Sequence, residues 1–328
     1  MRTPFLFCLS LAIAGSAAAQ NDPVPALVEA TGVRAIVKDG KHNAFTAMVK
    51  WQGAYWLSFR KAESHESSDG DIIVLRSEDT QTWTDALRLK VFPDNRDPQF
   101  LATEKRLFLY DPSLKGKSLA TFVTFTDDGK TWSTALPVYK STYILWKPIT
   151  HEGEFFATAH TKLNDGKTRN VHLITSRDGV KWDKVSLIRS GNWESETTIH
   201  FVTPTRIAAF LRQKHGSPQA SVYFSDAPYT TWTGGAVPNM HFGGHAAYSV
   251  NGVNYLFSRS YDAGNTTPGL TIYTFDETAK LTPYCKLPAG GDCSYPSMVV
   301  DGKDMVVAYY SSHEGPANIY LCRVPLAK

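Results

Sequence analysis

Short apolar runs separated by turn residues dominate this chain. Runs such as Ile72 to Leu75 and Leu119 to Phe125 mix β-branched and aromatic side chains, and each is soon followed by Asp, Gly or Pro. β-branched and aromatic residues fit a pleated strand, whereas Gly, Asp and Pro favour turns. Stretches with a helical period of apolar positions are nearly absent. The pattern therefore predicts an all-β protein built from many short strands.

A short segment ending in tryptophan occurs four times at an almost constant interval. The tryptophans stand at positions 83, 132, 182 and 232, so the intervals are 49, 50 and 50 residues. An interval of this size is typical of propeller and solenoid repeats. Each copy follows a predicted strand, so strand, turn and strand together form one unit. We therefore expect each repeat to be one blade of a β-propeller.

The repeated segment has the chemistry of a tight hairpin. An aspartate can accept hydrogen bonds from nearby backbone N–H groups, a following glycine supplies positive φ, and the tryptophan covers the turn. The glycine is present in two copies, as Gly129 and Gly179, while the last copy is altered by Ala227-Pro228. The residues given this structural role are Asp79, Trp83, Asp128, Trp132, Asp178, Trp182 and Trp232.

The repeat divides the chain into six predicted units, with no Pro/Gly/Ser-rich linker between them. Propellers usually have four to eight blades. A count of five blades competes with six, because the last two units lack the repeated turn. We predict one domain over residues 20–328, with blades near 40–90, 91–140, 141–190, 191–240, 241–290 and 291–328.

The first residues have the features of an export signal. Arg2 precedes an apolar run from Phe5 to Ala14, and small residues follow up to Ala19. This arrangement predicts a cleaved signal peptide over residues 1–19, too short to be a membrane span. We therefore expect a secreted or periplasmic protein with no membrane partner.

Composition adds expectations about partners and cross-links. The net charge is only +3, with acids and bases interspersed, so nucleic acid is not expected as a partner. In an oxidising compartment Cys285 and Cys293 are close enough to form a disulfide, leaving Cys322 as a buried thiol. No paired His or Cys spacing predicts a metal site, and no cofactor is expected. A closed propeller needs no partner to cover its edges, so we expect a monomer.

The starts of the blades are where functional side chains are expected. The innermost strand of each propeller blade opens onto the central channel at one end, so polar residues there converge on one pocket. Each predicted blade start carries a charged or aromatic group beside a turn residue. The corresponding stretches are 41–46, 95–98, 145–147, 194–197, 243–245 and 291–296.

The repeated turn is similar to the Asp-box, Ser/Thr-x-Asp-x-Gly-x-x-Trp, of sialidases and related propellers. Over nearly its whole mature length the chain resembles the sialidase-like superfamily. The order of the first blade implies that Asp69 is the acid/base, with Asp71 as the other choice. The segment after Glu194 resembles the one holding the sialidase glutamate and an arginine that binds the substrate carboxylate, which implies Glu196 and Arg212.

The last blade carries the third part of the resemblance. Ser294-Tyr295-Pro296-Ser297 resembles the segment with the catalytic tyrosine of sialidases, and Arg259 is a candidate for a further arginine. A phenol has a pKa near 10, so a tyrosine nucleophile requires a base such as Glu196 beside it. This pairing keeps a carboxylate nucleophile away from an anionic sugar. The resemblance thus implies a sialidase-like glycoside hydrolase acting on a glycan.

One departure leaves the sugar open. Sialidases begin with an Arg-Ile-Pro segment whose arginine holds the substrate carboxylate, and the equivalent place here reads His42-Asn43-Ala44-Phe45. Fewer arginines mean fewer bidentate bonds to a carboxylate. Trp146 suits stacking on a sugar or a place in the core equally well. The further residues expected at the pocket are His42, Asn43, Arg60, His65, Arg96, Asp97, His245, Asp292, Tyr310, His313 and Glu314.

Two other functions fit the same residues. A propeller polysaccharide lyase would abstract a proton beside a uronate carboxylate, using Tyr295, His245 or Tyr310, with Arg212 neutralising the carboxylate. A sugar-binding propeller without catalysis would leave Asp69, Glu196 and Tyr295 apart. If Tyr295 is not the nucleophile, two of the pocket carboxylates could run a retaining or inverting mechanism.

Overall fold

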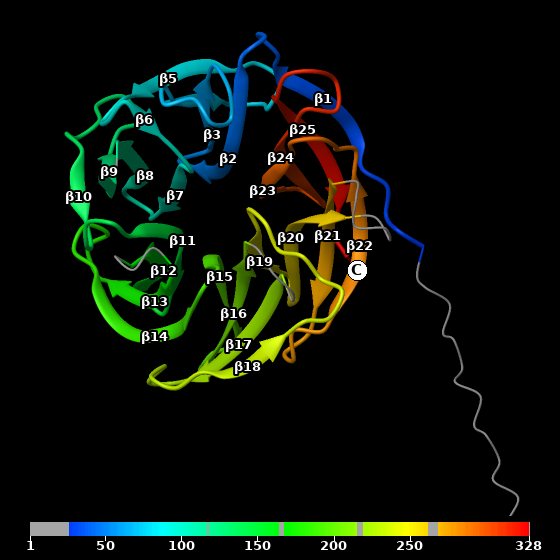
Figure 1. Cartoon of the computed structure of the whole chain (residues 1–328). Coiled ribbons are helices and arrows are strands. Elements are labelled where there is room, and N and C mark those ends of the chain that lie inside the picture. Colours follow the sequence, from blue (N-terminus) through cyan, green and yellow to red (C-terminus); the bar gives the residue numbers. More distant parts are fainter. Residues whose placement is uncertain (1–25, 117, 164–166, 215–218, 262–267, 328) are drawn as a thin grey trace, which may run out of the picture.

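The computed structural model describes residues 26–116, 118–163, 167–214, 219–261 and 268–327. All named elements in these ranges are β-strands, arranged as six antiparallel sheets around a central axis (Figure 1). The predicted all-β, six-bladed propeller is confirmed, and the alternative of five blades is wrong. No helix within these ranges is long and apolar enough to cross a membrane. The predicted signal peptide lies outside the described residues.

The first three blades follow the chain in order. Blade I consists of β2 (His42–Trp51), β3 (Ala54–Ala62), β4 (Asp71–Ser77) and β5 (Thr84–Leu89). Blade II consists of β6 (Asp94–Asn95), β7 (Gln99–Ala102), β8 (Leu107–Lys115), β9 (Ser118–Thr126) and β10 (Leu136–Val138). Blade III consists of β11 (Ile144–His151), β12 (Glu154–Lys162), β13 (Arg169–Ser176) and β14 (Asp183–Gly191).

The remaining blades include the closure of the ring. Blade IV consists of β15 (Glu194–Thr203), β16 (Arg206–Gln213), β17 (Ala220–Asp226) and β18 (Thr233–Ala236). Blade V consists of β19 (Ala246–Val250), β20 (Val253–Tyr261), β21 (Pro268–Phe275) and β22 (Leu281–Leu287). Blade VI consists of β23 (Ser294–Asp301), β24 (Asp304–Ser311), β25 (Asn318–Pro325) and β1 (Thr31–Val37).

The outer strand of blade VI comes from the other end of the chain. β1 pairs antiparallel with β25, with Thr31 opposite Arg323 and Val37 opposite Ile319. The two ends of the chain thus share one sheet (Figure 1). The predicted blade boundaries did not include this strand, because nothing in its short sequence points to a partner so distant.

The repeated turns join the third and fourth strands of blades I to III. Asp178 Oδ1 accepts hydrogen bonds from the backbone N–H groups of Val180 (2.8 Å) and Lys181 (2.7 Å). Asp128 Oδ1 does the same for Lys130 (2.8 Å) and Thr131 (2.7 Å), as does Asp79 Oδ1 in blade I. In blade I Thr80 takes the place of the glycine, with φ of 65°. The hairpins expected at these positions are present.

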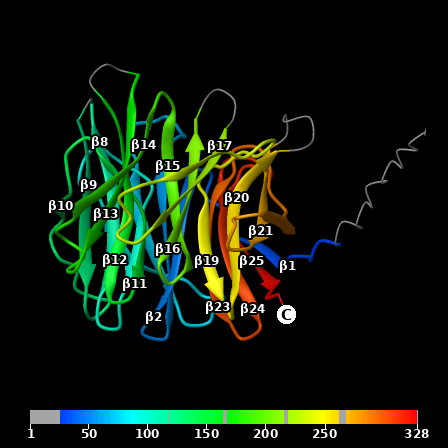
Figure 2. The same cartoon turned by 90° about the horizontal axis from the view of Figure 1, so that it is seen from below.

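The inner strands surround a narrow central cavity, and the strands run between the two ends of the propeller (Figure 2). The cavity has a volume of about 320 Å³. Each of the six inner strands contributes to its lining, through Ala47, Gln99, Ile149, Thr198, Ala246 and Ser297. Apolar clusters fill the space between neighbouring blades, so the core is divided among the blade interfaces.

The predicted disulfide between Cys285 and Cys293 is wrong. Cys285, Cys293 and Cys322 are all free and buried. Cys285 lies in β22, the outer strand of blade V, whereas Cys293 directly precedes β23, the inner strand of blade VI. Although the two cysteines are close in sequence, they therefore form no bond with each other. Burial raises the pKa of the Cys285 thiol to about 11, which makes it a poor nucleophile.

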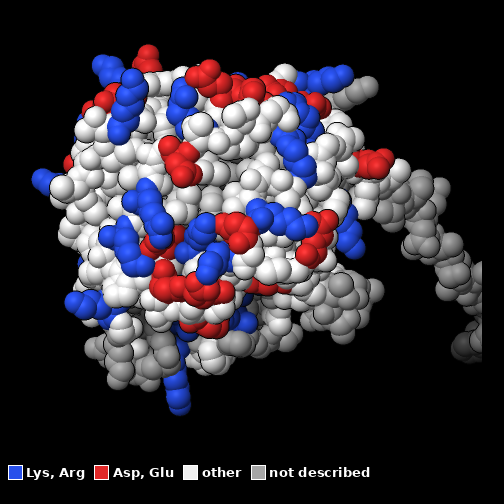
Figure 3. All heavy atoms as spheres, turned by 90° about the horizontal axis from the view of Figure 1, so that it is seen from above, with Lys and Arg blue, Asp and Glu red and all other residues white. Residues whose placement is uncertain are grey.

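Lys and Arg are interspersed with Asp and Glu over the side of the propeller seen in Figure 3. No concentrated basic surface is visible on this face. The expectations that the protein is a monomer and binds no nucleic acid remain predictions.

Candidate active site

The starts of the inner strands share a backbone distortion. The ladder register is shifted between Ala44 and Ala47 in blade I, and between Ser294 and Ser297 in blade VI. Blades III and IV have the same shift, and in blade II the inner strand is broken between β6 and β7. Such bulges redirect side chains and are frequent beside active sites. The residues in these bulges or breaks include Phe45, Asp97, Lys147, Glu196 and Tyr295.

Four of these five residues have left-handed backbone conformations. Their φ values are 62° for Phe45, 46° for Asp97, 42° for Lys147 and 53° for Tyr295. Positive φ is costly for residues other than Gly, Asn and Asp, and it occurs where the surrounding structure enforces it. Strained positions repeated around one end of the channel mark that end as the candidate active site.

Tyr295 and Glu196 meet at this end. The Tyr295 hydroxyl lies 3.3 Å from Glu196 Oε1 and donates to it. Glu196 Oε2 accepts hydrogen bonds from Arg212 (2.7 Å) and from the backbone N–H of Gly244 (3.2 Å). The pairing of tyrosine, glutamate and arginine expected from the resemblance is therefore formed, with residues from blades IV, V and VI.

The two members of the pair have opposite pKa shifts. Burial would raise the pKa of Glu196, but the Arg212 charge and hydrogen bond outweigh it and lower the pKa to about 2. Burial raises the pKa of Tyr295 well above its ordinary value, and the neighbouring Asp97 and Glu196 raise it further. At neutral pH the resting pair is thus a neutral phenol that donates a hydrogen bond to an ionised carboxylate.

Asp97 is the second carboxyl group beside Tyr295. The side chains of Asp97 and Tyr295 interact, and Asp97 Oδ1 is buried without a hydrogen-bond partner among the described residues. Burial raises the pKa of Asp97, and the Glu196 carboxylate adds to the rise. Asp97 therefore holds a proton more readily than an ordinary aspartate, as a general acid must.

Two cations complete this centre. Burial lowers the pKa of Lys147 to about 8, while Asp97 and Glu196 act in the opposite direction. Arg259 donates from Nε to the carbonyl oxygen of Cys293 (2.8 Å), and its charge interacts with Glu196. The centre thus combines three cationic groups, counting Arg212, with the two carboxyl groups of Glu196 and Asp97.

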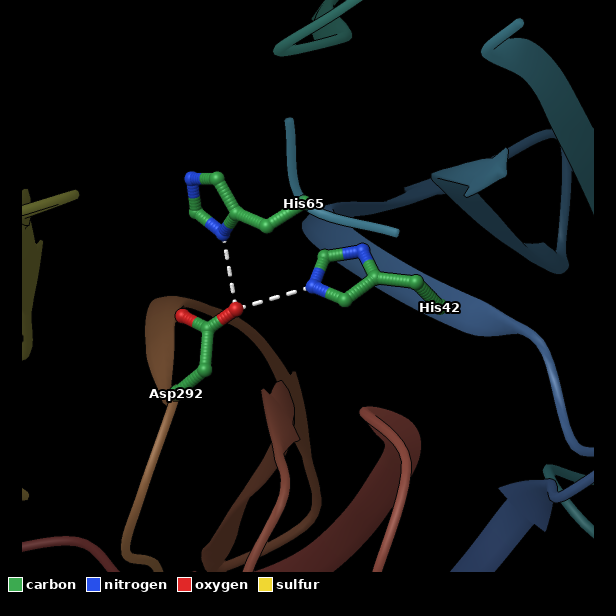
Figure 4. A group of neighbouring side chains, drawn as sticks. All are labelled: His42, His65 and Asp292. Atoms are coloured by element: carbon green, nitrogen blue, oxygen red, sulfur yellow. Dashed lines mark hydrogen bonds and ion pairs between the residues drawn. The ribbon is translucent and has the colours of Figure 1, made fainter. Parts of the chain in front are cut away.

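A second cluster lies beside the Tyr295 centre. His42 Nε2 and His65 Nδ1 both lie within hydrogen-bond distance of Asp292 Oδ2, at 2.8 and 2.7 Å (Figure 4). Tyr310 donates to Asp292 Oδ1 at 3.0 Å. Burial would raise the pKa of Asp292, but the hydrogen bonds from the two histidines hold it well below its usual range. Among the described residues, His42, His65 and Asp292 have donor atoms close enough together to hold a metal ion.

Several residues expected at the pocket are too deeply buried to contact a substrate directly. Trp146 is 1% exposed and lies edge-on to Tyr295, with ring centroids 5.5 Å apart. His245 is fully buried and bonded through Nε2 to the Phe210 carbonyl (2.7 Å). The residues corrected from substrate contact to support of the site are Asn43, Arg60, Trp146, His245 and Tyr310.

Arg60 and Arg96 hold the loop that carries His65. Arg60 donates to the carbonyls of Ser64 (3.0 Å) and Ser67 (2.5 Å), and it bonds Asp94. Arg96 donates to the His65 carbonyl (3.1 Å) and also bonds Asp94. Both arginines therefore orient the loop and are not free to bind a sugar carboxylate.

Asp69 lies away from the Tyr295 centre. Its side chain is exposed and accepts hydrogen bonds from the Glu63 backbone N–H. Asp71, the other choice for the acid/base, bonds Arg88 and Lys90. The same loop brings His65 to Asp292, whereas Asp69 forms no hydrogen bond with Tyr295 or Glu196 in the described part of the chain, so its role as the acid stays a prediction.

Two further candidates lie toward the outside of blade VI. Glu314 is bonded to Lys38 (3.3 Å), directly after the outer strand β1, and to Tyr320 (3.0 Å) on the neighbouring strand β25. His313 is exposed and lies 2.8 Å from the Ser311 hydroxyl. Neither forms a hydrogen bond with Tyr295 or Glu196 in the described part of the chain, so the geometry gives them no place at this centre.

The sequence analysis missed part of the site. His160 and His241 interact electrostatically with Glu196 and Arg212, and burial lowers the pKa of each to about 4. One signal was present in the sequence: Asp97, Lys147 and Tyr295 are each followed by proline. Proline restricts the residue before it and is found in sheets mainly at bulges and strand starts.

Solved structures with the same architecture include carbohydrate enzymes. A protein of unknown function from Dyadobacter fermentans superposes with a TM-score of 0.77 at 17% identity, covering 90% of this chain and 100% of its own. Trypanosoma rangeli sialidase in complex with the inhibitor DANA gives 0.72 at 12% identity, covering 90% of this chain and 60% of its own. This chain has the fold of the sialidase-like propellers.

A third solved structure widens the comparison. Penicillium chrysogenum alpha-L-arabinanase complexed with arabinobiose gives a TM-score of 0.61 at 11% identity, covering 90% of this chain and 96% of its own. No protein-family model and no curated protein sequence matches the chain. The sialidase-like propeller fold is thus shared with glycoside hydrolases of two kinds, while the chain spans about 60% of the trypanosome sialidase.

Proposed function

We propose that this protein is an exported glycoside hydrolase that works through a tyrosine nucleophile. The observation that carries the proposal is the Tyr295 hydroxyl 3.3 Å from Glu196, beside Asp97 and at one end of a sialidase-like propeller. Export is proposed from residues 1–19, whose basic start, apolar run and small residues fit a signal peptide.

In the proposed first step Tyr295 attacks the anomeric carbon and its proton passes to Glu196. Asp97 donates a proton to the glycosidic oxygen, so the leaving sugar departs as a neutral alcohol. Water, deprotonated by Asp97, then attacks the anomeric carbon, and Glu196 returns the proton to Tyr295. Two displacements at one carbon retain the anomeric configuration.

The electrostatics of the site support this division of roles. The raised pKa of Asp97 favours the protonated form that a general acid needs, and the lowered pKa of Glu196 keeps it ionised as an acceptor. A phenolate that forms during attack is stabilised by the charges of Arg212 and Arg259, because both interact with the Tyr295 centre.

The two other functions are less well supported. A lyase could still use Tyr295 as its base, but its other two candidate bases, His245 and Tyr310, are fully buried. A silent binding propeller predicts that Asp69, Glu196 and Tyr295 stay apart. Glu196 and Tyr295 form a hydrogen bond, which speaks against it, although Asp69 lies elsewhere. The sugar itself is left open, because the first arginine of the sialidase pattern is missing.

The test is mass spectrometry of products after incubation with sialylated, uronate-containing and neutral glycans. Hydrolysis adds one water across the cleaved bond, and Tyr295→Phe or Glu196→Gln should lower kcat/KM by about 10³-fold. Tyr284→Phe, at a tyrosine bonded to Pro325 on the outside of blade V, is the matched control and should keep full activity. A product with a new double bond, absorbing in the near ultraviolet, would establish a lyase instead. Binding without turnover would leave a sugar-binding propeller.

A further inference from the structure

The cluster of His42, His65 and Asp292 brings together three segments that are far apart in sequence. His42 begins β2, His65 lies in the loop between β3 and β4, and Asp292 precedes β23. Their ligand atoms all lie within 4.8 Å of one another. Figure 4 shows both imidazole rings pointing at the same carboxylate oxygen from different sides. Two neutral rings and one carboxylate are a common set of ligands for a divalent transition metal.

The distances are close to those of a bound metal. With bonds of 2.0–2.2 Å, ligand atoms around a tetrahedral zinc ion are separated by roughly 3.4 Å. The two histidine nitrogens are 2.8 and 2.7 Å from Asp292 Oδ2, so a shift well under 1 Å at each side chain opens the space. The geometry points to a three-ligand site for a Zn²⁺-like cation at His42, His65 and Asp292.

The ligands are held by a surrounding set of hydrogen bonds. Tyr310 donates to Asp292 Oδ1, the oxygen that faces away from the histidines, and the Asp292 backbone N–H donates to Ser312 Oγ at 2.7 Å. Arg96 fixes the His65 carbonyl, and Arg60 fixes the rest of that loop. Metal ligands in proteins are usually oriented by such outer hydrogen bonds. The buried Arg60 and the partly buried Arg96 thus serve to hold the loop that carries His65.

The donor set selects the class of metal. Mg²⁺ and Ca²⁺ prefer oxygen ligands only, whereas imidazole suits Zn²⁺ and its neighbours in the transition series. The side chains of His42, Asp292 and His65 are 11%, 30% and 39% exposed, so a face of the cluster is open to solvent. Three protein ligands with an open fourth position are characteristic of zinc ions that bind water or substrate.

The site adjoins the Tyr295 centre. The Phe45 ring lies 5.3 Å from the His65 ring and 4.8 Å from the Tyr295 ring, and Tyr310 contacts both His42 and Tyr295. His42 stands where the sialidase pattern has its first arginine. The cation replaces that missing positive charge and takes an anionic oxygen, such as a carboxylate, of the sugar. This last step rests on the proposed function, whereas metal binding itself does not.

The experiment measures metal binding directly, without a glycan. Full-length protein treated with a chelator is dialysed against buffered Zn²⁺, and bound zinc is quantified by elemental analysis. We expect one Zn²⁺ per chain. Asp292→Asn and His65→Gln should weaken binding by about 100-fold or more, beyond the usual cost of losing an outer hydrogen bond. His151→Gln, at a histidine that ends β11 and is bonded to the Pro204 carbonyl, is the matched control and should bind normally.

A second readout separates a built site from loose binding. Co²⁺ in place of Zn²⁺ should give the visible absorption bands of a low-coordinate cobalt ion, and these bands should vanish in His65→Gln. His65 is in a loop at the surface, so His65→Gln should fold. It therefore still tests the site if Asp292→Asn does not fold. Zinc bound in less than stoichiometric amounts, or equally by all variants, would overturn the inference.

The inference and the proposed function fail separately. Glycan hydrolysis by chelator-treated protein that binds no zinc would leave the hydrolase and remove the metal site. Stoichiometric zinc with no turnover of any glycan would leave the metal site and remove the hydrolase. If both hold, adding Zn²⁺ should lower KM for acidic glycans and leave KM for neutral ones unchanged.

Discussion

The two ends of this propeller are built from the same repeats but differ in what the repeats carry. At the end with the aspartate turns, Asp79, Asp128 and Asp178 each accept two backbone hydrogen bonds, with N–O distances from 2.7 to 2.9 Å. At the end with the candidate site, the corresponding strand starts carry a phenylalanine, two carboxyl groups, a lysine and a tyrosine.

The two ends place different constraints on the sequence, one on the structure of the turns and one on the chemistry of the site. The turn residues act on backbone groups two and three positions ahead, so blades I to III use the same side chain for the same purpose. The residues at the other end face a shared centre, where each contributes a different group. We therefore expect substitutions at one end to change stability, and at the other to change chemistry.

The largest expected effect is at the candidate site. Asp97→Asn should lower kcat/KM for natural glycans by about 10²- to 10⁴-fold, because the leaving group loses its proton donor. Aryl glycosides whose leaving groups need no protonation should be affected much less. In the wild type, kcat/KM should fall as pH rises through the raised pKa of Asp97, and this alkaline decline should be absent from the variant.

An equal loss for both kinds of glycoside would show that Asp97 is not the acid. Urea unfolding of Asp97→Asn provides the control. Its free energy of unfolding should stay near or above that of the wild type, since the substitution removes a buried acid.

The second effect concerns acid pH and tests whether a buried histidine contributes to the free energy of unfolding. Burial lowers the pKa of His245 to about 4, below the value near 6.5 of the unfolded chain. As pH falls below 6.5 the unfolded state takes up the proton first, so stability is full above pH 7 and declines toward pH 4. Between pH 8 and pH 5 the loss should be about 2 kcal/mol for this residue.

Urea unfolding at the two pH values measures this loss. His245→Gln should lose about 2 kcal/mol less than the wild type over the same interval. His151→Gln, at a half-buried histidine that ends β11, serves as the control and should follow the wild type. An identical pH dependence in all three proteins would contradict the assignment.

A smaller effect is expected at the turn end. Asp178→Ala removes two hydrogen bonds from backbone N–H groups to a carboxylate, and it should lower the free energy of unfolding by about 1–2 kcal/mol. Asp183→Ala, at an exposed aspartate five positions later, should change it by less than about 0.5 kcal/mol. Activity per folded molecule should be unchanged in both, and a loss of activity in Asp178→Ala alone would break the comparison.

The smallest effect is at the hairpins between first and second strands. Glu152-Gly153 and Asn251-Gly252 have two successive residues with positive φ, 48° and 79° in the first pair and 52° and 80° in the second. Asn-Gly is the preferred pair for this turn. Glu152→Asn should therefore raise the free energy of unfolding by about 0.5 kcal/mol, and Asn251→Glu should lower it by a similar amount. Thermal unfolding measures both as shifts of the midpoint in opposite directions. Shifts of the same sign in both variants would contradict this account.

The fold could be predicted because its signals are local. Strand runs, the Asp and Gly of the turns and the 50-residue interval all act within a few residues, and they led to six blades. Tyr295, Glu196 and Arg212 were also found, because blade starts must converge. The place of Asp69, away from Tyr295, could not be predicted, since Arg60 and Arg96 orient that loop through Asp94, a partner that no local pattern reveals. The prediction of a disulfide was wrong because the chain crosses from an outer strand to an inner one between Cys285 and Cys293.

The pairing of β1 with β25 also governs how the chain reaches this fold. Thr31 and Arg323 are opposite each other, although nearly the whole chain separates them. The entropy of closing a loop must be lost before such a pair forms, and folding slows as contacts become more remote in sequence. Five blades can assemble from neighbouring hairpins as the chain emerges, but β1 has no strand to pair with until β25 arrives near the end of the chain. The ring is thus completed last, by the segment made first.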